Sequence, residues 1–129
     1  MALIVAGCGT PKPMALKSDP SEAGQAPANY RKFIQKNLQD TLVDAPSIRD
    51  LVIGTPKLSK CEETYYADRV YKTTIHGWVV PVQFNAKNNY GGYSGKTNRY
   101  YWFQGEKSIR VTASDPASEY GGTICSTPL

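Results

Sequence analysis

Apolar and polar residues alternate over residues 78 to 87, and this is the clearest pattern in the chain. The apolar side chains at every second position are Trp78, Val80, Val82, Phe84 and Ala86. A period of two residues predicts a β-strand with one buried face. Residues 99 to 103 are rich in aromatic side chains and predict a second strand. The segment between them is rich in glycine and asparagine, so residues 77 to 103 are expected to form a hairpin with a long loop.

A helical period covers residues 27 to 43. Its apolar side chains follow the i, i+3, i+4 spacing of one helix face, and charged and amide side chains occupy the other face. The positions on the apolar face are Tyr30, Phe33, Ile34, Leu38, Thr41 and Leu42. Pro27 suits the first turn of a helix, and the residues leading to Pro46 end it. We expect this amphipathic helix to cover the buried face of the sheet.

The remaining strands are shorter and lie on both sides of the hairpin. They are expected at residues 48 to 53, 69 to 75 and 108 to 112. Residues 57 to 68 are polar and are interpreted as a loop, and His76 with Gly77 as a tight turn or a bulge. Pro81 has no N–H group, so its nitrogen should face a sheet edge or a bulge. The predicted fold class is α+β, with one N-terminal amphipathic helix packed on a four- to five-stranded antiparallel meander sheet.

The 129 residues are expected to form one domain with loosely packed ends. Residues 1 to 8 are interpreted as a remnant signal segment, and residues 9 to 26, which are rich in Pro, Ser, Ala and Gly, as a flexible tether. Residues 27 to 113 are expected to form the single α+β domain, and residues 114 to 129 a loosely ordered C-terminal tail. No apolar run approaches the roughly 20 residues that a transmembrane helix needs.

The three cysteines, Cys8, Cys61 and Cys125, differ in their surroundings. Cys8 ends an apolar run, and residues 5 to 8, Val-Ala-Gly-Cys, resemble the lipobox of bacterial lipoproteins. That resemblance implies transfer of a diacylglyceryl group to Cys8 and cleavage before it. The other interpretation is that this run is the first strand of a cytosolic domain, with Cys8 as a buried thiol. If Cys8 is the lipid site, Cys61 and Cys125 remain as an even pair that an oxidising periplasm allows to form a disulfide, although pairing cannot be deduced from sequence.

The net charge and the available reactive side chains limit the classes of function that the sequence allows. The net charge of +4 comes from basic residues that are scattered among acidic ones, so it indicates no particular partner. Residues 91 to 97 come near a phosphate-binding loop, but Tyr90 occupies the position of its first glycine and a strand follows instead of a helix. With His76 as the one histidine and no clustered cysteines, the sequence offers neither a catalytic base in a nucleophile pair nor a zinc site. We expect no cofactor, no metal, no catalytic residues and no small-molecule substrate.

The glycine-rich loop of the hairpin is the candidate partner-binding site. Exposed tyrosines on such a loop anchor interfaces at low entropic cost. The candidate residues are Lys87, Asn88, Tyr90, Gly91, Gly92, Tyr93 and Lys96. Basic and aromatic side chains also interleave along the same hairpin, which favours stacking on single-stranded nucleic acid as an alternative. The residues of this alternative surface are Lys87, Tyr90, Tyr93, Lys96, Arg99, Tyr100 and Trp102.

Three fragments together resemble a family of small uncharacterised proteobacterial lipoproteins. They are the Val-Ala-Gly-Cys start, residues 44 to 50 (Asp-Ala-Pro-Ser-Ile-Arg-Asp) and residues 77 to 95 (Gly-Trp-Val-Val-Pro-Val-Gln-Phe-Asn-Ala-Lys-Asn-Asn-Tyr-Gly-Gly-Tyr-Ser-Gly). The chain departs from the family at Pro81, where we expect relatives to carry cysteine more often. The resemblance implies an address in the cell envelope and no particular reaction. Gly9 stands where enteric lipoproteins of the inner membrane carry aspartate, which implies the outer membrane instead.

The expected function is therefore a membrane-anchored periplasmic lipoprotein that acts as a non-enzymatic binding or scaffolding module of the envelope, with an envelope protein as its partner. The alternative is a soluble cytosolic module that binds single-stranded nucleic acid or protein through the basic and aromatic hairpin.

Overall fold

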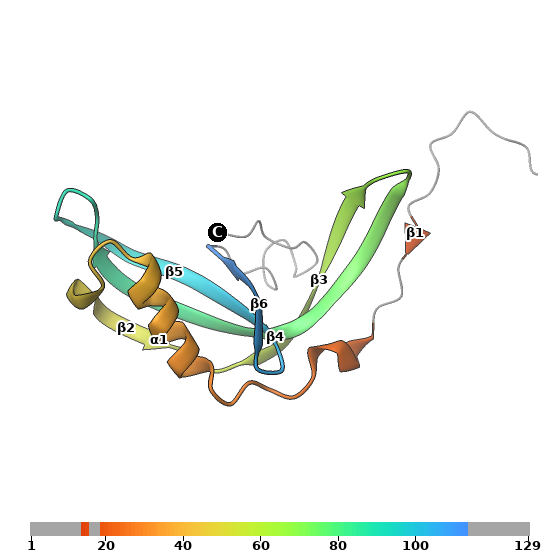
Figure 1. Ribbon diagram of the computed structural model, residues 1–129, viewed down its shortest axis with the longest axis horizontal. Coiled ribbons are helices and arrows are strands. Elements are labelled where there is room, and N and C mark those ends of the chain that lie inside the picture. The colour runs from red at the N-terminus through yellow and green to blue at the C-terminus, as the bar shows by residue number, and fades with distance from the viewer. Residues whose placement is uncertain (1–13, 16–18, 114–129) are drawn as a thin grey trace, which may run out of the picture.

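In the described part of the chain, one curled sheet with a single α-helix packed on it makes up most of the structure (Figure 1). The computed structural model describes residues 14–15 and 19–113, without the side chains of Met14, Ala15 and Tyr65. The strands are β1 (Met14–Ala15), β2 (Arg49–Ile53), β3 (Lys57–Tyr66), β4 (Val70–Lys87), β5 (Tyr93–Gln104) and β6 (Lys107–Thr112). The helices are η1 (Pro20–Ala23), α1 (Tyr30–Thr41) and η2 (Ala45–Ser47). The predicted combination of an antiparallel sheet with one covering helix is confirmed.

Strand β4 is the centre of the sheet. It pairs antiparallel with β3 over its first half and with β5 over its second half, and β6 continues the sheet beyond β5. Strand β2 adds a short antiparallel pairing at Val82 to Asn85, and the two residues of β1 pair in parallel with Tyr71 and Lys72. Figure 1 shows β4 crossing the width of the molecule, from the turn beside β3 to the loop before β5. Four other strands thus depend on this one strand for their hydrogen bonds.

The prediction of a loop over residues 57 to 68 was wrong. Residues 57 to 66 form β3, which pairs one to one with residues 70 to 79 of β4. Among the described residues β3 is an edge strand, and an edge strand tolerates polar side chains because only one side of it joins the sheet. The expected break at His76 and Gly77 is also wrong, since β4 runs through both. A Cβ atom on Gly77 would lie 2.9 Å from the carbonyl oxygen of Phe103, so glycine here permits close strand packing.

The hairpin loop is shorter than predicted. Strand β5 begins at Tyr93 and not at Arg99, so the loop that joins it to β4 is only Asn88 to Gly92. The pairing register shifts between Asn85 and Lys87, which marks a bulge. Gly95 has a positive φ of 88° on the opposite strand, a backbone conformation that glycine adopts without strain.

The main core lies between α1 and one face of the sheet. The alternating residues predicted for β4 supply this face: Val80, Val82, Phe84 and Ala86 are buried, and Trp78 packs against them. The other members of this core are Ile34 and Leu38 of α1 and Tyr101 and Phe103 of β5. A second, smaller cluster on the opposite face contains Cys61, Val79 and Trp102. The alternation of apolar residues in β4 therefore predicted the main core correctly. The sheet also buries apolar side chains on its other face, which the alternation did not predict.

Helix α1 begins three residues later than the proline that was expected to open it. Its N-cap residue, Asn29, makes no side-chain capping bond. Instead, the backbone N–H groups of Ala28 and Asn29 donate to the carboxylate of Glu106, in the turn between β5 and β6. The carboxylate thus binds the N-cap residue and the residue before it, and a negative charge at this end interacts favourably with the helix dipole. The start of α1 is therefore fixed by a residue 77 positions away from Asn29 in the sequence.

Residues 19 to 26 belong to the folded domain, which corrects their assignment to the tether. Ala23 of η1 is fully buried, and its carbonyl oxygen accepts from the N–H of Gly105 at 2.8 Å. The indole Nε1 of Trp78 donates to the carbonyl oxygen of Gly24 at 3.1 Å. Part of the tether prediction (residues 9 to 13 and 16 to 18), the signal segment with Cys8 and the C-terminal tail lie outside the described residues.

Pro81 lies where one edge of β4 changes partner. Strands β2 and β3 occupy the same edge, because Val82 pairs with β2 and Val79 with β3 while both also pair with β5 on the other side. The connection between β2 and β3 passes Pro81, and the N–H of Gly54 donates to the Pro81 carbonyl oxygen at 2.8 Å. A Cβ atom on Gly54 would lie 2.8 Å from Pro81 Cγ. The missing N–H of Pro81 thus faces a gap in the edge, as predicted.

Candidate functional site

The loop between β4 and β5, which we call the tip loop (Asn88 to Gly92), is held by its own hydrogen bonds. The backbone N–H of Asn88 donates to the carbonyl oxygen of Gly92 at 2.8 Å, and that of Gly91 donates to the Asn88 carbonyl oxygen at 3.1 Å. The side-chain Oδ1 of Asn88 accepts from the N–H groups of Tyr90 at 2.9 Å and of Gly92 at 3.2 Å. Gly91 has a φ of 80°, which the turn requires. Asn88 therefore organises the loop from its base.

The two tyrosines predicted to form the binding site have different surroundings. The side chain of Tyr90 is 96% exposed at the tip. Tyr93 is half-buried, with the guanidinium carbon of Arg49 3.6 Å from its ring centroid and Lys87 Nζ 5.7 Å from it. Cation–π contacts of this kind contribute about 0.5–1 kcal/mol each at exposed sites. Tyr93 thus packs against Arg49 and Lys87 at the end of the sheet. Of the two tyrosines, Tyr90 is the one that is open to a partner.

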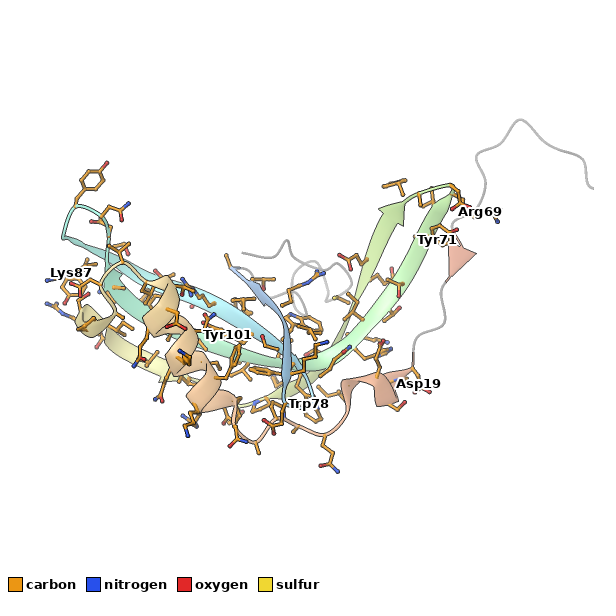
Figure 2. All side chains as sticks on the ribbon, in the orientation of Figure 1. Asp19, Arg69, Tyr71, Trp78, Lys87 and Tyr101 are labelled. Atoms are coloured by element: carbon orange, nitrogen blue, oxygen red, sulfur yellow. The ribbon has the colours of Figure 1, made fainter. Side chains whose placement is uncertain are left out.

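Basic side chains surround Tyr93 at this end of the sheet. Arg49 of β2 and Lys96 of β5 both pair with Asn85 of β4, so they lie in one row across three strands. Lys87 pairs with Tyr93 one step closer to the tip loop. Figure 2 places Lys87 at one end of the molecule, with Arg69 and Tyr71 at the other. The predicted site residues are therefore brought together, and Arg49 is the cation that the sequence-based prediction missed, because β2 is distant in the sequence.

The surface proposed for nucleic acid is not assembled. Arg99 points to α1, where its Nη1 donates to Thr41 Oγ1 at 2.7 Å and to Asn37 Oδ1 at 3.4 Å. Trp102 is 1% exposed and belongs to the small cluster with Cys61. With Tyr93 packed against Arg49, the basic and aromatic residues of the hairpin do not form one open stacking platform.

Cys61 is disulfide-bonded. It is the one cysteine among the described residues, so its partner is Cys8 or Cys125. The pairing with Cys125 stays a prediction. Cys61 is 2% exposed and, as half of a disulfide, is not available as a thiol nucleophile.

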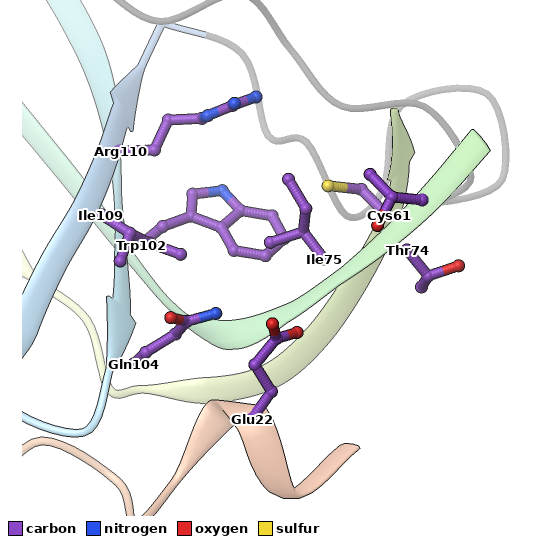
Figure 3. Close-up of a pocket in the computed structure, with 9 residues that line it drawn as sticks. Glu22, Cys61, Thr74, Ile75, Trp102, Gln104, Ile109 and Arg110 are labelled. Carbon is purple, nitrogen blue, oxygen red and sulfur yellow. The ribbon is translucent and has the colours of Figure 1, made fainter. Parts of the chain in front are cut away.

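A pocket of about 230 Å³ lies against the small cluster, on the face of the sheet opposite α1 (Figure 3). Its walls come from five elements: η1, β3, β4, β5 and β6. The lining residues with chemical interest are Glu22, Ile75, Trp102, Gln104, Ile109 and Arg110. The sequence-based prediction missed this pocket because its residues are separated along the chain. The signal that was available is the aromatic pair Tyr100 and Trp102, which point away from Tyr101 and Phe103 in the same strand.

Two general features concern the described residues only. In that part of the chain no group of three or more His, Cys, Asp or Glu side chains is arranged to hold a metal ion. None of its helices has the length and apolar character needed to cross a bilayer.

Comparison with known proteins gave no match: no family model, no curated protein and no solved structure matches the chain.

Proposed function

We propose that the protein is a non-enzymatic binding module of the bacterial cell envelope, held at a membrane by a lipid on Cys8, and that its tip loop binds a protein partner in the periplasm. The observation that carries the binding role is Tyr90, 96% exposed on a loop whose backbone is fixed by hydrogen bonds. A rigid loop loses little conformational entropy on binding, and a tyrosine supplies a large contact area with a polar end.

The charges beside the tip loop define the kind of partner. Arg49 and Lys87 lie over the Tyr93 ring at the base of the loop, and Lys96 lies in the same row of the sheet as Arg49. An acidic protein surface complements this arrangement, because opposite charges at the rim of an interface speed association and select the partner.

The disulfide at Cys61 supports localisation to the cell envelope. Disulfides persist in the periplasm and outside cells, and they are rare in the reducing cytosol. The lipobox-like residues 5 to 8 and the resemblance to proteobacterial lipoproteins support the same address, and Gly9 favours the outer membrane.

The position of β1 determines which end of the molecule the proposed lipid anchor would hold at the membrane. Six residue steps separate Cys8 from Met14, so the anchor reaches at most about 20 Å from β1. Strand β1 pairs with Tyr71 and Lys72, next to the turn between β3 and β4. That turn lies at the opposite end of the molecule from Lys87 and the tip loop (Figure 2). A lipid on Cys8 would therefore hold the β3–β4 end near the membrane and present Tyr90 away from it.

The binding role is tested by placing a photo-crosslinking amino acid at position 90 in cells that express the full chain. Position 66 is the matched control, because Tyr66 is a tyrosine of similar exposure (79%) at the opposite end of the sheet. We expect one discrete cross-linked protein from position 90, none of the same mass from position 66, and loss of the complex after charge reversal of Lys87 and Lys96. Equal cross-linking from both positions, or none from position 90, would contradict the proposal.

The anchor is tested separately in the same cells. We expect the unmodified chain in the membrane fraction with the mass of a lipid on Cys8, and the Cys8→Ser variant in the soluble fraction. Full-length protein that is soluble and carries no added mass would reject the lipid anchor while leaving the tip loop as a binding site.

A further inference from the structure

Two rows of side chains, which we call the polar rows, cross strands β2, β4 and β5 near the tip loop. The first row is Arg49, Asn85 and Lys96, and the second row is Val52, Gln83 and Asn98. Residues that pair directly across strands point to the same face of a sheet. Gln83 and Asn85 alternate with buried residues of the main core, so both rows point to the face opposite α1. Arg49, Lys96 and Asn98 are exposed and Val52 is 58% exposed, so this part of the face is open to solvent.

The first row presents hydrogen-bond donors. The guanidinium carbon of Arg49 lies 3.6 Å from the ring centroid of Tyr93. A guanidinium stacked on an aromatic face keeps its N–H groups available at its rim, where they bind a carboxylate with two parallel bonds. The Oδ1 of Asn85 accepts from the backbone N–H of Gly95 at 3.1 Å, which leaves the Asn85 Nδ2 as a donor between the two cations of the row.

The positive charge of the first row is not neutralised by the described residues around it. No ion pair among the described residues includes Arg49 or Lys96, and none joins Arg49 to its neighbour in the chain, Asp50. The sequence has no acidic residue from position 69 to position 105, so the β4–β5 hairpin supplies no carboxylate. Two cations on one open face therefore favour a ligand with two negative groups.

The spacing of the two cations favours one backbone conformation of such a ligand. Arg49 and Lys96 lie on either side of β4, so their backbone positions are about 9.5 Å apart at the usual strand separation. A polyproline II segment has three residues per turn and a rise of about 3.1 Å per residue, which places side chains i and i+3 on one side about 9.3 Å apart. In a β-strand, side chains i and i+2 share a face at only about 6.7 Å.

The second row favours a peptide over other anionic ligands. The Nε2 of Gln83 donates to the Oδ1 of Asn98 at 3.2 Å, which leaves the Gln83 Oε1 as an acceptor and the Asn98 Nδ2 as a donor. One acceptor beside one donor complements the N–H and C=O groups of a peptide backbone, whereas a phosphate chain would offer acceptors alone. Val52 adds apolar contact in the same row. The two rows are about 6.7 Å apart along β4, so one backbone can lie between them.

We propose that the polar rows bind an extended acidic peptide segment whose carboxylates stand at positions i and i+3. The segment crosses the strands from β2 to β5, with one carboxylate on Arg49 and the other on Lys96, and its backbone faces Gln83 and Asn98. This inference rests on the proposed function, because it names the part of the acidic partner that lies beside the tip loop.

The test follows the side-chain amide signals of Asn85 and Asn98 in the ¹⁵N-labelled full chain by NMR. The first probe is the acetylated and amidated peptide Pro-Glu-Pro-Pro-Glu-Pro, with its glutamates at i and i+3. The matched control is Pro-Glu-Pro-Glu-Pro-Pro, which has the same composition and charge with the glutamates at i and i+2. The third probe is tripolyphosphate. We expect saturable shifts with the first peptide, with a Kd on the order of 1 mM, and about fivefold weaker binding of the second peptide.

Variants identify the two cations that hold the carboxylates. Arg49→Gln and Lys96→Gln should each weaken binding of the first peptide about fivefold, because each removes one charge-assisted contact. Lys32→Gln removes an equal charge from an exposed position of α1, on the other side of the sheet, and should change the Kd by less than about twofold. Equal effects of all three variants would show that net charge, and not the first row, controls binding.

The inference about the segment and the proposed function can fail separately. The segment is rejected if the first peptide gives no saturable shift, if the two peptides bind equally, or if tripolyphosphate binds as tightly as the first peptide. In each of those cases a cross-link from position 90 would still support the tip loop as a binding site. Binding of the first peptide without any cross-link from position 90 would support the polar rows and reject the role of Tyr90.

Discussion

Tyr101 shows how a single side chain connects the helix to the sheet. It is fully buried in the main core, and its hydroxyl donates to Asn37 Oδ1 of α1 at 2.6 Å. Arg99, two residues earlier in β5, donates to the same Asn37 oxygen and to Thr41. Burial raises the pKa of the Tyr101 hydroxyl above its ordinary value of 10.0, and the neighbouring Arg99 acts in the opposite direction. The neutral hydroxyl is thus part of the native packing.

The raised pKa of Tyr101 predicts a loss of stability at alkaline pH. Above the ordinary value of 10.0 the unfolded chain releases the phenolic proton while the folded chain keeps it. The unfolded state then binds fewer protons, so the free energy of unfolding falls as pH rises from that value through the folded-state pKa. Urea unfolding between about pH 8 and pH 11 should show this fall, and Tyr101→Phe should be less sensitive than the unmodified chain. An identical slope in both proteins would show that Tyr101 does not carry the effect.

At the scale of elements, the start of α1 depends on Glu106 in the turn between β5 and β6. The helix has an apolar stripe that the sequence makes evident, and this stripe is buried through Ile34 and Leu38. Its starting residue is not evident, since Glu106 supplies the capping acceptor from the turn between β5 and β6. The same turn also binds η1 through Gly105. The β5–β6 turn therefore orders the whole segment from η1 to the first turn of α1.

Removing the Glu106 carboxylate should destabilise the protein. Glu106→Ala leaves two N–H groups without their acceptor and is expected to lower the free energy of unfolding by about 1 kcal/mol, the usual value of a helix cap. Glu106→Gln keeps one acceptor oxygen and should lose about half as much. Urea unfolding followed by circular dichroism measures both variants. Glu62→Gln, at an exposed position of β3, is the control and should be neutral within about 0.5 kcal/mol; an effect as large as that of Glu106→Ala would point to net charge as the cause.

The elements also show what the sequence was able to predict. The even positions of β4 and the stripe of α1 were found because each buries one face, and a buried face leaves a period in the sequence. Strand β3 was missed because its charged residues, such as Lys60 and Glu62, are tolerated at an edge and its pairing is dictated by β4. The tip loop was located, but its extent and the role of Arg49 depend on contacts between distant segments. The Trp102 pocket depends on such contacts entirely.

For the whole molecule, the effect of the Cys61 disulfide depends on whether its partner is Cys125 or Cys8. A bond to Cys125 would close a loop of about 65 residues and, by the chain-entropy model, stabilise the fold by about 4 kcal/mol. A bond to Cys8 would occupy the sulfur that the lipid anchor requires. Cys61 belongs to the small cluster with Val79 and Trp102, so either disulfide would tie a terminal segment to the face of the sheet opposite α1.

Single serine substitutions distinguish the two connections. We expect Cys125→Ser to release one thiol at Cys61 that reacts after unfolding in denaturant, and to lower the denaturation midpoint. Cys8→Ser should release none and leave the midpoint unchanged. Thiol titration together with urea unfolding of the two variants gives the answer, and a thiol released by Cys8→Ser would reject both the predicted pairing and the anchor.

The order of strands along the chain has a consequence for synthesis on the ribosome. Strands β1, β2 and β3 all pair with β4, yet each of them is translated before it. At about 5–20 residues per second, the 21 steps from Tyr66 to Lys87 take about one to four seconds. During that interval the nascent N-terminal half exposes strand edges and the apolar stripe of α1, which are the features that holdase chaperones bind. A chain truncated before Lys87 should therefore stay sensitive to protease, and β5, which completes the main core through Tyr101 and Phe103, also follows β4.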